Sequence, residues 1–203
     1  ATCAIRKDSG DDPDITNGIL VCATVEKSAK GIMIDGGEGV GRVTRAGLDQ
    51  PVGAAAINSV PRAMIAQACE EAAKTVAYDG GFRVVISIPQ GSELAKKTFN
   101  PRLGIEGGLS VIGTSGIVEP MSTAALVDTL CLEINVLAEG GKKSLLLSPG
   151  SYGETFAQQT LELDTSEQVL CSNYIGEALK AAAEKGFERI LLVGHIGKLV
   201  KLG

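Results

Sequence analysis

The sequence predicts an α+β N-terminal domain, with a mixed sheet and packed helices, followed by an α/β C-terminal domain with a parallel sheet. The first domain is placed at residues 1–140 and the second at residues 141–203, because the pattern changes after Gly141. Beyond that glycine a strand, a short loop and a helix follow one another repeatedly, which is typical of parallel strands with crossover helices. Hydrophobic residues make up 44% of the chain and aromatic residues only 3%, so the core is aliphatic, as suits α/β packing.

In the first domain, strands are expected where β-branched and aliphatic residues run between glycines and other turn residues. These segments are 18–25, 31–35, 42–45, 82–88 and 109–112. Helices are expected where apolar residues recur at helical spacing, at 61–77 and 123–138. Pro61 suits a first helical turn, and Gly140 and Gly141 suit a helix end.

In the second domain the same reasoning places three strands, each leading into a helix. The strands are 144–147, 168–171 and 189–193, and the helices are 153–160, 175–185 and one that starts near His195. Three such units are few for a parallel sheet, so the sequence predicts that this α/β domain is truncated.

Composition excludes several classes of function. The net charge of −5 argues against a general nucleic-acid-binding surface, and no apolar run reaches the roughly 18 residues that a membrane span needs. The five cysteines are odd in number and widely spaced, without a CxxC pair. They indicate free thiols in a reducing, cytoplasmic setting and no zinc or other metal site.

The segment from Lys97 to Gly108 concentrates Gly, Pro, Asn and Arg in a way that a fold alone does not need. We expect a binding loop in which Arg102 presents its planar fork of donors to a carboxylate or phosphate. Asn100 and Lys97 stand beside it, and Arg62, which follows an Asn-Ser-Val-Pro turn, is a further candidate. Arg102 is the predicted carboxylate clamp, with Lys96, Lys97 and Arg62 as helpers, and Asn100 is a further candidate for substrate binding.

The run Gly36–Gly41 invites a phosphate-loop interpretation but does not fit it. Arg42 and Val43 stand where a P-loop has Lys and Ser or Thr, and a strand rather than a helix follows. A glycine-rich hairpin and a loop that packs against a large planar ligand both stay open, with Asp35 and Glu38 as polar groups in the second case.

Small polar residues and glycines follow each strand of the second domain. In an open parallel sheet ligands bind beyond the carboxyl ends of the strands, so these loops form the predicted second site. Its candidate residues are Ser148, Gly150, Asn173, Gly194 and His195. Ordinary βα turns also use Gly and Asn, and His195 is equally compatible with a general base and with a histidine that bonds the backbone at a helix start.

Several long motifs in a fixed order resemble the family of cobalt-precorrin-5B C1-methyltransferases, the CbiD family. The segments that carry the resemblance are Lys7–Thr16, Gly36–Thr44, Asn58–Arg62, Leu94–Ile105, Ser148–Gly153 and Leu192–Leu202. The family's chain begins earlier and continues past Gly203 into a Thr-His-Ser segment, so this sequence is expected to be a trimmed core.

The resemblance implies an enzyme that transfers a methyl group from S-adenosylmethionine to C1 of cobalt-precorrin-5B, giving cobalt-precorrin-6A. It implies a cobalt-containing tetrapyrrole as partner on the first domain, bound by Arg102, Asn100, Lys97, Glu38 and Arg62. S-adenosylmethionine is then expected on the second domain, at Ser148, Gly150, Asn173 and Gly194, with His195 as the catalytic residue. Asn173 can hydrogen-bond the ribose or the adenine.

Two other functions stay open at this stage. One is a non-catalytic module that binds a tetrapyrrole or a nucleotide, or an inactive truncated core of the enzyme. The other is a small-molecule phosphotransferase, against which the missing P-loop lysine counts. The sequence leaves homo-oligomer formation open.

Overall fold

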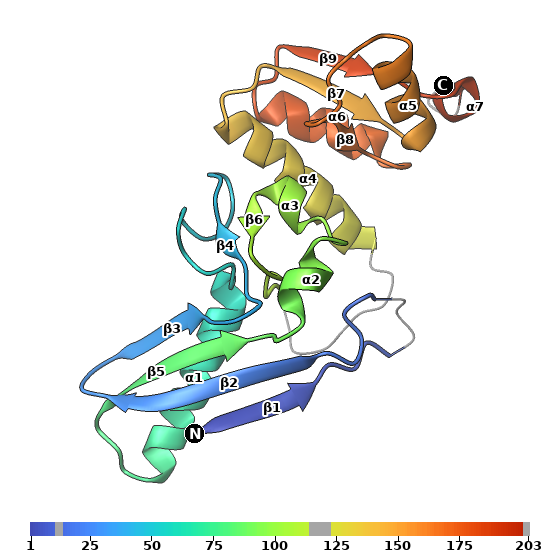
Figure 1. The fold of residues 1–203 in the computed structure, drawn as a ribbon. Helices are drawn as coiled ribbons and strands as arrows, with labels where there is room; N and C mark the ends of the chain where they lie inside the picture. Colours follow the sequence, from blue (N-terminus) through green and yellow to red (C-terminus); the bar gives the residue numbers. More distant parts are fainter. Residues whose placement is uncertain (11–13, 114–122, 201–203) are drawn as a thin grey trace. The chain divides into compact units, whose positions relative to one another are not determined.

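A computed structural model describes residues 1–10, 14–113 and 123–200 (Figure 1). The chain forms two compact units, one made of residues 1–45 and 49–121 and the other of residues 46–48 and 122–203. Each unit has its own hydrophobic core. The expected division near residues 139–142 therefore differs from the observed one, because the helix before it packs into the second core.

The first unit contains a mixed four-stranded sheet in the order β1-β2-β5-β3. Its strands are β1 (Thr2–Arg6), β2 (Leu20–Ser28), β5 (Gly81–Ser87) and β3 (Ile32–Gly36). Strand β2 pairs antiparallel with both β1 and β5, whereas β3 is parallel to β5. The mixed sheet is as predicted, but β1 was missed, since its exposed residues show no burial alternation.

Helix α1 (Ser59–Thr75) packs on this sheet through one side only. Ile65 and Cys69 contact the core around Val84 and Ile86 of β5. The other apolar residues that predicted the helix face outward, and Met64 and Val76 are 46% and 72% exposed. The spacing was therefore a correct signal for the helix but not for which side is buried.

The rest of the first unit is a layer of short elements beside the sheet. Strand β4 (Arg42–Val43) pairs antiparallel with β6 (Ile105–Glu106). The predicted binding loop contains the helical turn α3 (Asn100–Leu103) and follows another short helix, α2 (Gly91–Ala95). The expected strand at 109–112 is reduced to isolated bridges of Leu109 and Val111.

Three backbone segments meet in this layer at distances that exclude a side chain. A Cβ on Gly39 would lie 1.7 Å from the carbonyl oxygen of Ile88, and one on Gly108 would lie 2.2 Å from that of Gly39. Gly39 also has a φ of +71°, and its carbonyl accepts a 2.9 Å hydrogen bond from Leu109. The glycine-rich run is thus not a hairpin, since β3 and β4 lie in different sheets.

The second unit is a three-stranded parallel sheet in the order β8-β7-β9. Its elements are α4 (Thr123–Glu139), β7 (Ser144–Ser148), α5 (Ser151–Gln159), β8 (Val169–Leu170), α6 (Ile175–Glu184), β9 (Arg189–Leu192) and α7 (Ile196–Leu199). The parallel sheet of strand–helix units is as predicted.

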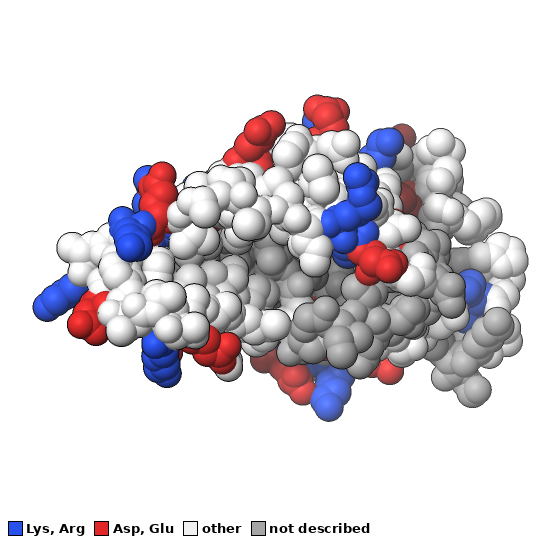
Figure 2. All heavy atoms as spheres, turned by 90° about the horizontal axis from the view of Figure 1, so that it is seen from below, with Lys and Arg blue, Asp and Glu red and all other residues white. Residues whose placement is uncertain are grey.

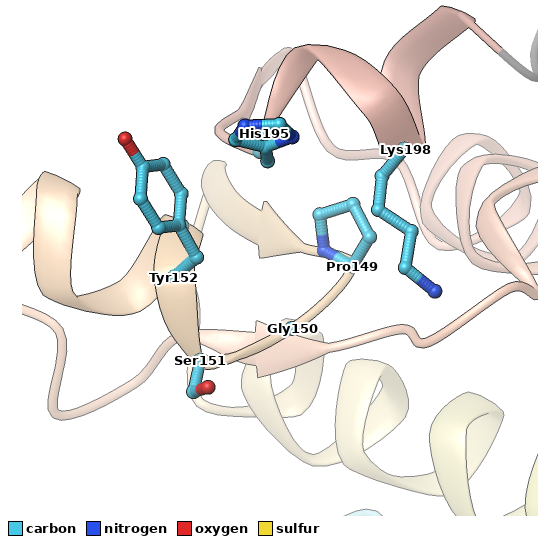
Figure 3. Close-up of a pocket in the computed structure, with 8 residues that line it drawn as sticks. Pro149, Gly150, Ser151, Tyr152, His195 and Lys198 are labelled. Atoms are coloured by element: carbon cyan, nitrogen blue, oxygen red, sulfur yellow. The ribbon is translucent and has the colours of Figure 1, made fainter.

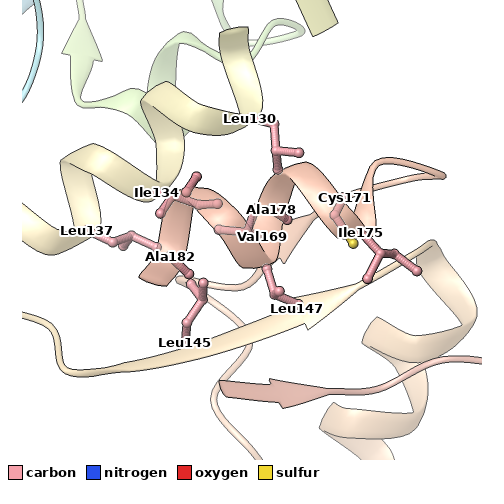
Figure 4. Close-up of a cluster of buried hydrophobic side chains, with 11 residues drawn as sticks. Leu130, Ile134, Leu137, Leu145, Leu147, Val169, Cys171, Ile175, Ala178 and Ala182 are labelled. Carbon is pink, nitrogen blue, oxygen red and sulfur yellow. The ribbon is translucent and has the colours of Figure 1, made fainter. Parts of the chain in front are cut away.

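Helices α4 and α6 cover one face of this sheet and form its core (Figure 4). Ile134 of α4, Leu147 of β7, Val169 of β8 and Ala178 of α6 are all fully buried there. The connection from β7 to β8 and the connection from β8 to β9 run in opposite directions along the sheet. Because such connections are right-handed, α5 lies on the face opposite α6. The direction of winding therefore reverses beside β7, and a switch point lies between β7 and β9.

The chain's five cysteines are all unpaired. Cys171 is buried, and burial raises the pKa of its thiol, whereas Cys3 is exposed. The expectation of free thiols is confirmed, but they are not uniformly buried. The cytoplasmic location inferred from them stays a prediction.

Replacing Gly39 by alanine is predicted to destabilise the first unit far more than replacing Gly107. Both glycines have positive φ, but a Cβ on Gly107 meets no atom within 4 Å. Gly107→Ala should cost about 1–2 kcal/mol from the left-handed backbone alone. Gly39→Ala adds overpacking of about 1–3 kcal/mol. Equal losses in urea denaturation would show that the three segments separate easily.

Candidate functional site

A pocket of about 310 Å³ lies at the carboxyl ends of β7 and β9, where the winding of the second sheet reverses (Figure 3). Two of the loops that the sequence predicted as a site, those following β7 and β9, contribute to it. The residues that line it are Pro149, Gly150, Ser151, Tyr152, Gly153, Gly194, His195 and Lys198. The structure thus brings three predicted residues, Gly150, Gly194 and His195, to one cavity.

Ser148 lies beneath this pocket rather than in it. Its side chain is fully buried, and its hydroxyl donates a 2.6 Å hydrogen bond to the carbonyl of Val193. A Cβ on Gly153 would lie 1.9 Å from that hydroxyl, so α5 starts directly against it. Ser148 therefore ties the end of β7 to the end of β9, a task that its place in the sequence did not reveal.

His195 caps the first turn of α7. Its Nδ1 accepts a 3.1 Å hydrogen bond from the backbone N–H of Gly197, so in the neutral ring the proton is on Nε2. This is the backbone-bonding arrangement that the sequence left open. The imidazole also stands perpendicular to the ring of Tyr152, with centroids 5.2 Å apart. His195 is thus held in place, and its catalytic role stays a prediction.

Asn173 reaches the edge of the pocket through Lys198. The Lys198 ammonium donates a 3.0 Å hydrogen bond to Oδ1 of Asn173, which connects α7 to the loop after β8. Both side chains are exposed. Sequence reasoning named Asn173 but omitted Lys198 and Tyr152 from the site. Their position just after a strand end was the available signal.

In the first unit, Arg62 is committed to the backbone. Its guanidinium donates to the carbonyls of Ile57 and Ile34, both at 2.7 Å, and to that of Ala55 at 3.3 Å. These bonds join the start of α1 to β3 and to the segment before the helix. Three of its five N–H donors are thus used by the fold. The binding role of Arg62 stays a prediction.

Asn100 is likewise a structural residue in the described fold. It is 6% exposed, its amide nitrogen donates to the Gly108 carbonyl at 3.1 Å, and its amide oxygen accepts a 3.1 Å bond from Ser110. Arg102 lies half-buried in the last turn of α3, not in a loop as expected. Lys97 and Glu38 are exposed. Their binding roles remain predictions.

Two carboxylates near Arg62 show how this layer is held. A hydrogen bond from Arg42 lowers the pKa of Asp35, with a smaller contribution from Arg62. Hydrogen bonds from Gln50 and Ser59 lower the pKa of Asp49. Asp49 accepts both the backbone N–H and the hydroxyl of Ser59, so it caps α1 from outside the helix.

On the face shown in Figure 2, Lys and Arg are interspersed with Asp and Glu, so no patch of one sign dominates it. Within residues 1–10, 14–113 and 123–200, no helix is long and apolar enough to cross a bilayer. The same part of the chain holds no group of three or more His, Cys, Asp or Glu side chains placed to bind a metal ion.

A family model, CbiD, matches residues 1–120. The chain belongs to the CbiD family. Relatives named cobalt-precorrin-5B C(1)-methyltransferase are similar to it over nearly its whole length. The protein from Ruminiclostridium cellulolyticum is 53% identical over 201 residues, which are 99% of this chain and 52% of the relative. The protein from Moorella thermoacetica is 49% identical over 203 residues, which are 100% of this chain and 54% of the relative.

A crystal structure of the cobalamin biosynthesis protein CbiD from Archaeoglobus fulgidus also matches this CbiD chain. It is 28% identical, with a TM-score of 0.48, over 98% of this chain and 61% of the other. The chain spans about half the length of the curated relatives it matches.

Arg62→Met is predicted to destabilise the first unit by about 3 kcal/mol or more, because it leaves several carbonyls without a charged donor. Arg83→Met is the matched control, since Arg83 is largely exposed and lies 3.6 Å from an exposed Glu26 carboxylate. The control should cost about 0.5 kcal/mol or less. Urea denaturation measures both, and similar small losses would show that water replaces the Arg62 donors at little cost.

Proposed function

We propose that this chain is part of an S-adenosylmethionine-dependent methyltransferase that methylates C1 of cobalt-precorrin-5B, giving cobalt-precorrin-6A. The observation that carries the proposal is the similarity to proteins of that name across nearly the whole chain, at 53% and 49% identity. The shared name favours an enzyme over the non-catalytic binding module. The incomplete P-loop pattern disfavours the phosphotransferase.

The pocket at the carboxyl ends of β7 and β9 suits the methyl donor better than the tetrapyrrole. A volume of about 310 Å³ lies at the lower end of the range for small-molecule sites, and a macrocycle of four rings with several carboxylate arms is much larger. Lys198, His195 and Tyr152 supply a few polar and aromatic groups around glycine turns. We therefore assign S-adenosylmethionine to this pocket and the tetrapyrrole to the first unit.

S-adenosylmethionine supplies a methyl group bound to a positively charged sulfur. When C1 of the tetrapyrrole bonds to this methyl group, the carbon–sulfur bond breaks and its electron pair stays on sulfur. Because the donor is already activated, the protein's work is to orient the two substrates and to exclude water. In the pocket, Nε2 of His195 is the ring nitrogen left to accept or donate a proton, because Nδ1 is bonded to Gly197. Its ring is oriented by Gly197 and Tyr152.

On the first unit, the tetrapyrrole's carboxylates call for cations. Arg102 in α3 and Lys97 just before it remain the proposed contacts, because Asn100 and Gly104 hold this segment in a defined shape. Gly104 ends that helix in a left-handed conformation, with φ of +73°. Glu38 is exposed in the neighbouring glycine-rich run and stays a proposed polar contact.

The first test is whether S-adenosylhomocysteine binds in the proposed pocket of the whole protein. Gly150→Trp should abolish binding in a calorimetric titration, because Gly150 lines the pocket and a side chain there meets no atom within 4 Å of its Cβ. Lys180→Trp, on the exposed side of α6, is the control and should bind normally. Unchanged binding by Gly150→Trp would place the donor elsewhere, and transfer of a labelled methyl group to cobalt-precorrin-5B tests the reaction itself.

Arg102→Ala is predicted to weaken cobalt-precorrin-5B binding by roughly 1.5–3 kcal/mol, the range for a charge-assisted hydrogen bond. Arg102→Lys should restore only part of it, since an ammonium lacks the planar fork. Arg102 also interacts within the protein, so thermal melting accompanies each titration. A loss of stability with unchanged affinity would make Arg102 a structural residue, and Arg83→Ala serves as the control cation.

A further inference from the structure

We infer that the pocket at the carboxyl ends of β7 and β9 binds its ligand in one direction: the Lys198–Asn173 pair receives the carboxylate end, and Tyr152 with His195 receives the adenosyl end. This assignment rests on the proposed function, because it takes S-adenosylmethionine or its product as the occupant. It adds two residues, Lys198 and Tyr152, that determine how the ligand is oriented.

The cationic end of the pocket is the ammonium of Lys198, which bonds an amide and not a carboxylate. Some described lysines, such as Lys96 and Lys142, pair with a carboxylate within 4 Å. Lys198 instead donates to the neutral amide oxygen of Asn173 at 3.0 Å. No Asp or Glu is among the residues that line the pocket. The ammonium is therefore positioned by an amide, and no ion pair within 4 Å joins it to a described carboxylate.

This pair offers a carboxylate more than one donor. An ammonium has three N–H bonds, and one of them is used on Asn173. Since Asn173 accepts through Oδ1, its amide group keeps its N–H bonds for another partner. Charge-assisted bonds of this kind are about twice as strong as neutral ones. The pair thus favours an anionic group at this end of the pocket.

The other end is aromatic. The whole chain has only three Tyr, four Phe and no Trp. One of these few aromatic residues, Tyr152, is 59% exposed instead of being buried in a core. Its ring and that of His195 meet at 89°, which fixes both orientations. In Figure 3, Tyr152 and Lys198 lie on opposite sides of Pro149. A flat, partly polar base can pack on such rings, whereas a carboxylate gains little there.

Two ligands separate the ends experimentally. S-adenosylhomocysteine carries the amino-acid carboxylate, and 5′-methylthioadenosine has the same adenosyl group without it. In the whole protein, Lys198→Met should weaken S-adenosylhomocysteine binding tenfold or more and leave methylthioadenosine binding unchanged within about twofold. Lys180→Met is the matched control outside the pocket, and thermal melting checks that each variant is folded.

Tyr152→Ala should weaken both ligands by a similar factor, of about fivefold or more, and Tyr152→Phe should restore most of it. Equal loss of both ligands in Lys198→Met would overturn the assignment, since the lysine would then only shape the pocket. So would a Tyr152→Ala variant that loses S-adenosylhomocysteine alone, because the ligand would be reversed. If neither ligand binds the unaltered protein, the proposed function itself fails.

Discussion

Close approach of backbone to backbone is the constraint on which both units depend. In the first unit, Gly39 lies so near the Ile88 carbonyl that any side chain would overlap it. In the second, Gly153 lets α5 begin directly against Ser148 and the end of β9. Without the first contact the layer of short elements could not join the sheet. Without the second, α5 could not start close to the ends of β7 and β9, where the pocket lies.

Buried and half-buried donors then secure what the glycines bring together. Arg62 joins α1 to β3 and the preceding segment through backbone carbonyls, and Ser148 joins β7 to β9 in the same way. Asn100 does this within the α3 region. All three belong to motifs that resemble a binding site in the sequence. Polar groups buried among strands need partners, so the fold itself uses them.

The proposal that the second unit binds the methyl donor and the first unit the tetrapyrrole follows from the polar groups that the fold leaves available. In the second unit the loops after β7 and β9 leave a small pocket with His195, Tyr152 and Lys198 around it. The size of that pocket matches a nucleoside-sized ligand rather than a macrocycle. Reaction with a sulfonium donor asks the protein mainly for orientation, which suits a site with one histidine and few charges.

The sequence alone determined the alternation of strands and helices, the mixed and parallel sheets, and the position of Gly150, Gly194 and His195 at strand ends, because these depend on local periodicity. It also carried the family motifs. Only the tertiary structure decided which polar residues are consumed by the fold: Arg62 bonds a carbonyl 28 positions away, and Ser148 one 45 positions away. It likewise paired Tyr152 with His195 and Lys198 with Asn173. Contacts between distant segments depend on how strands are ordered in the sheet, and no local pattern encodes that order.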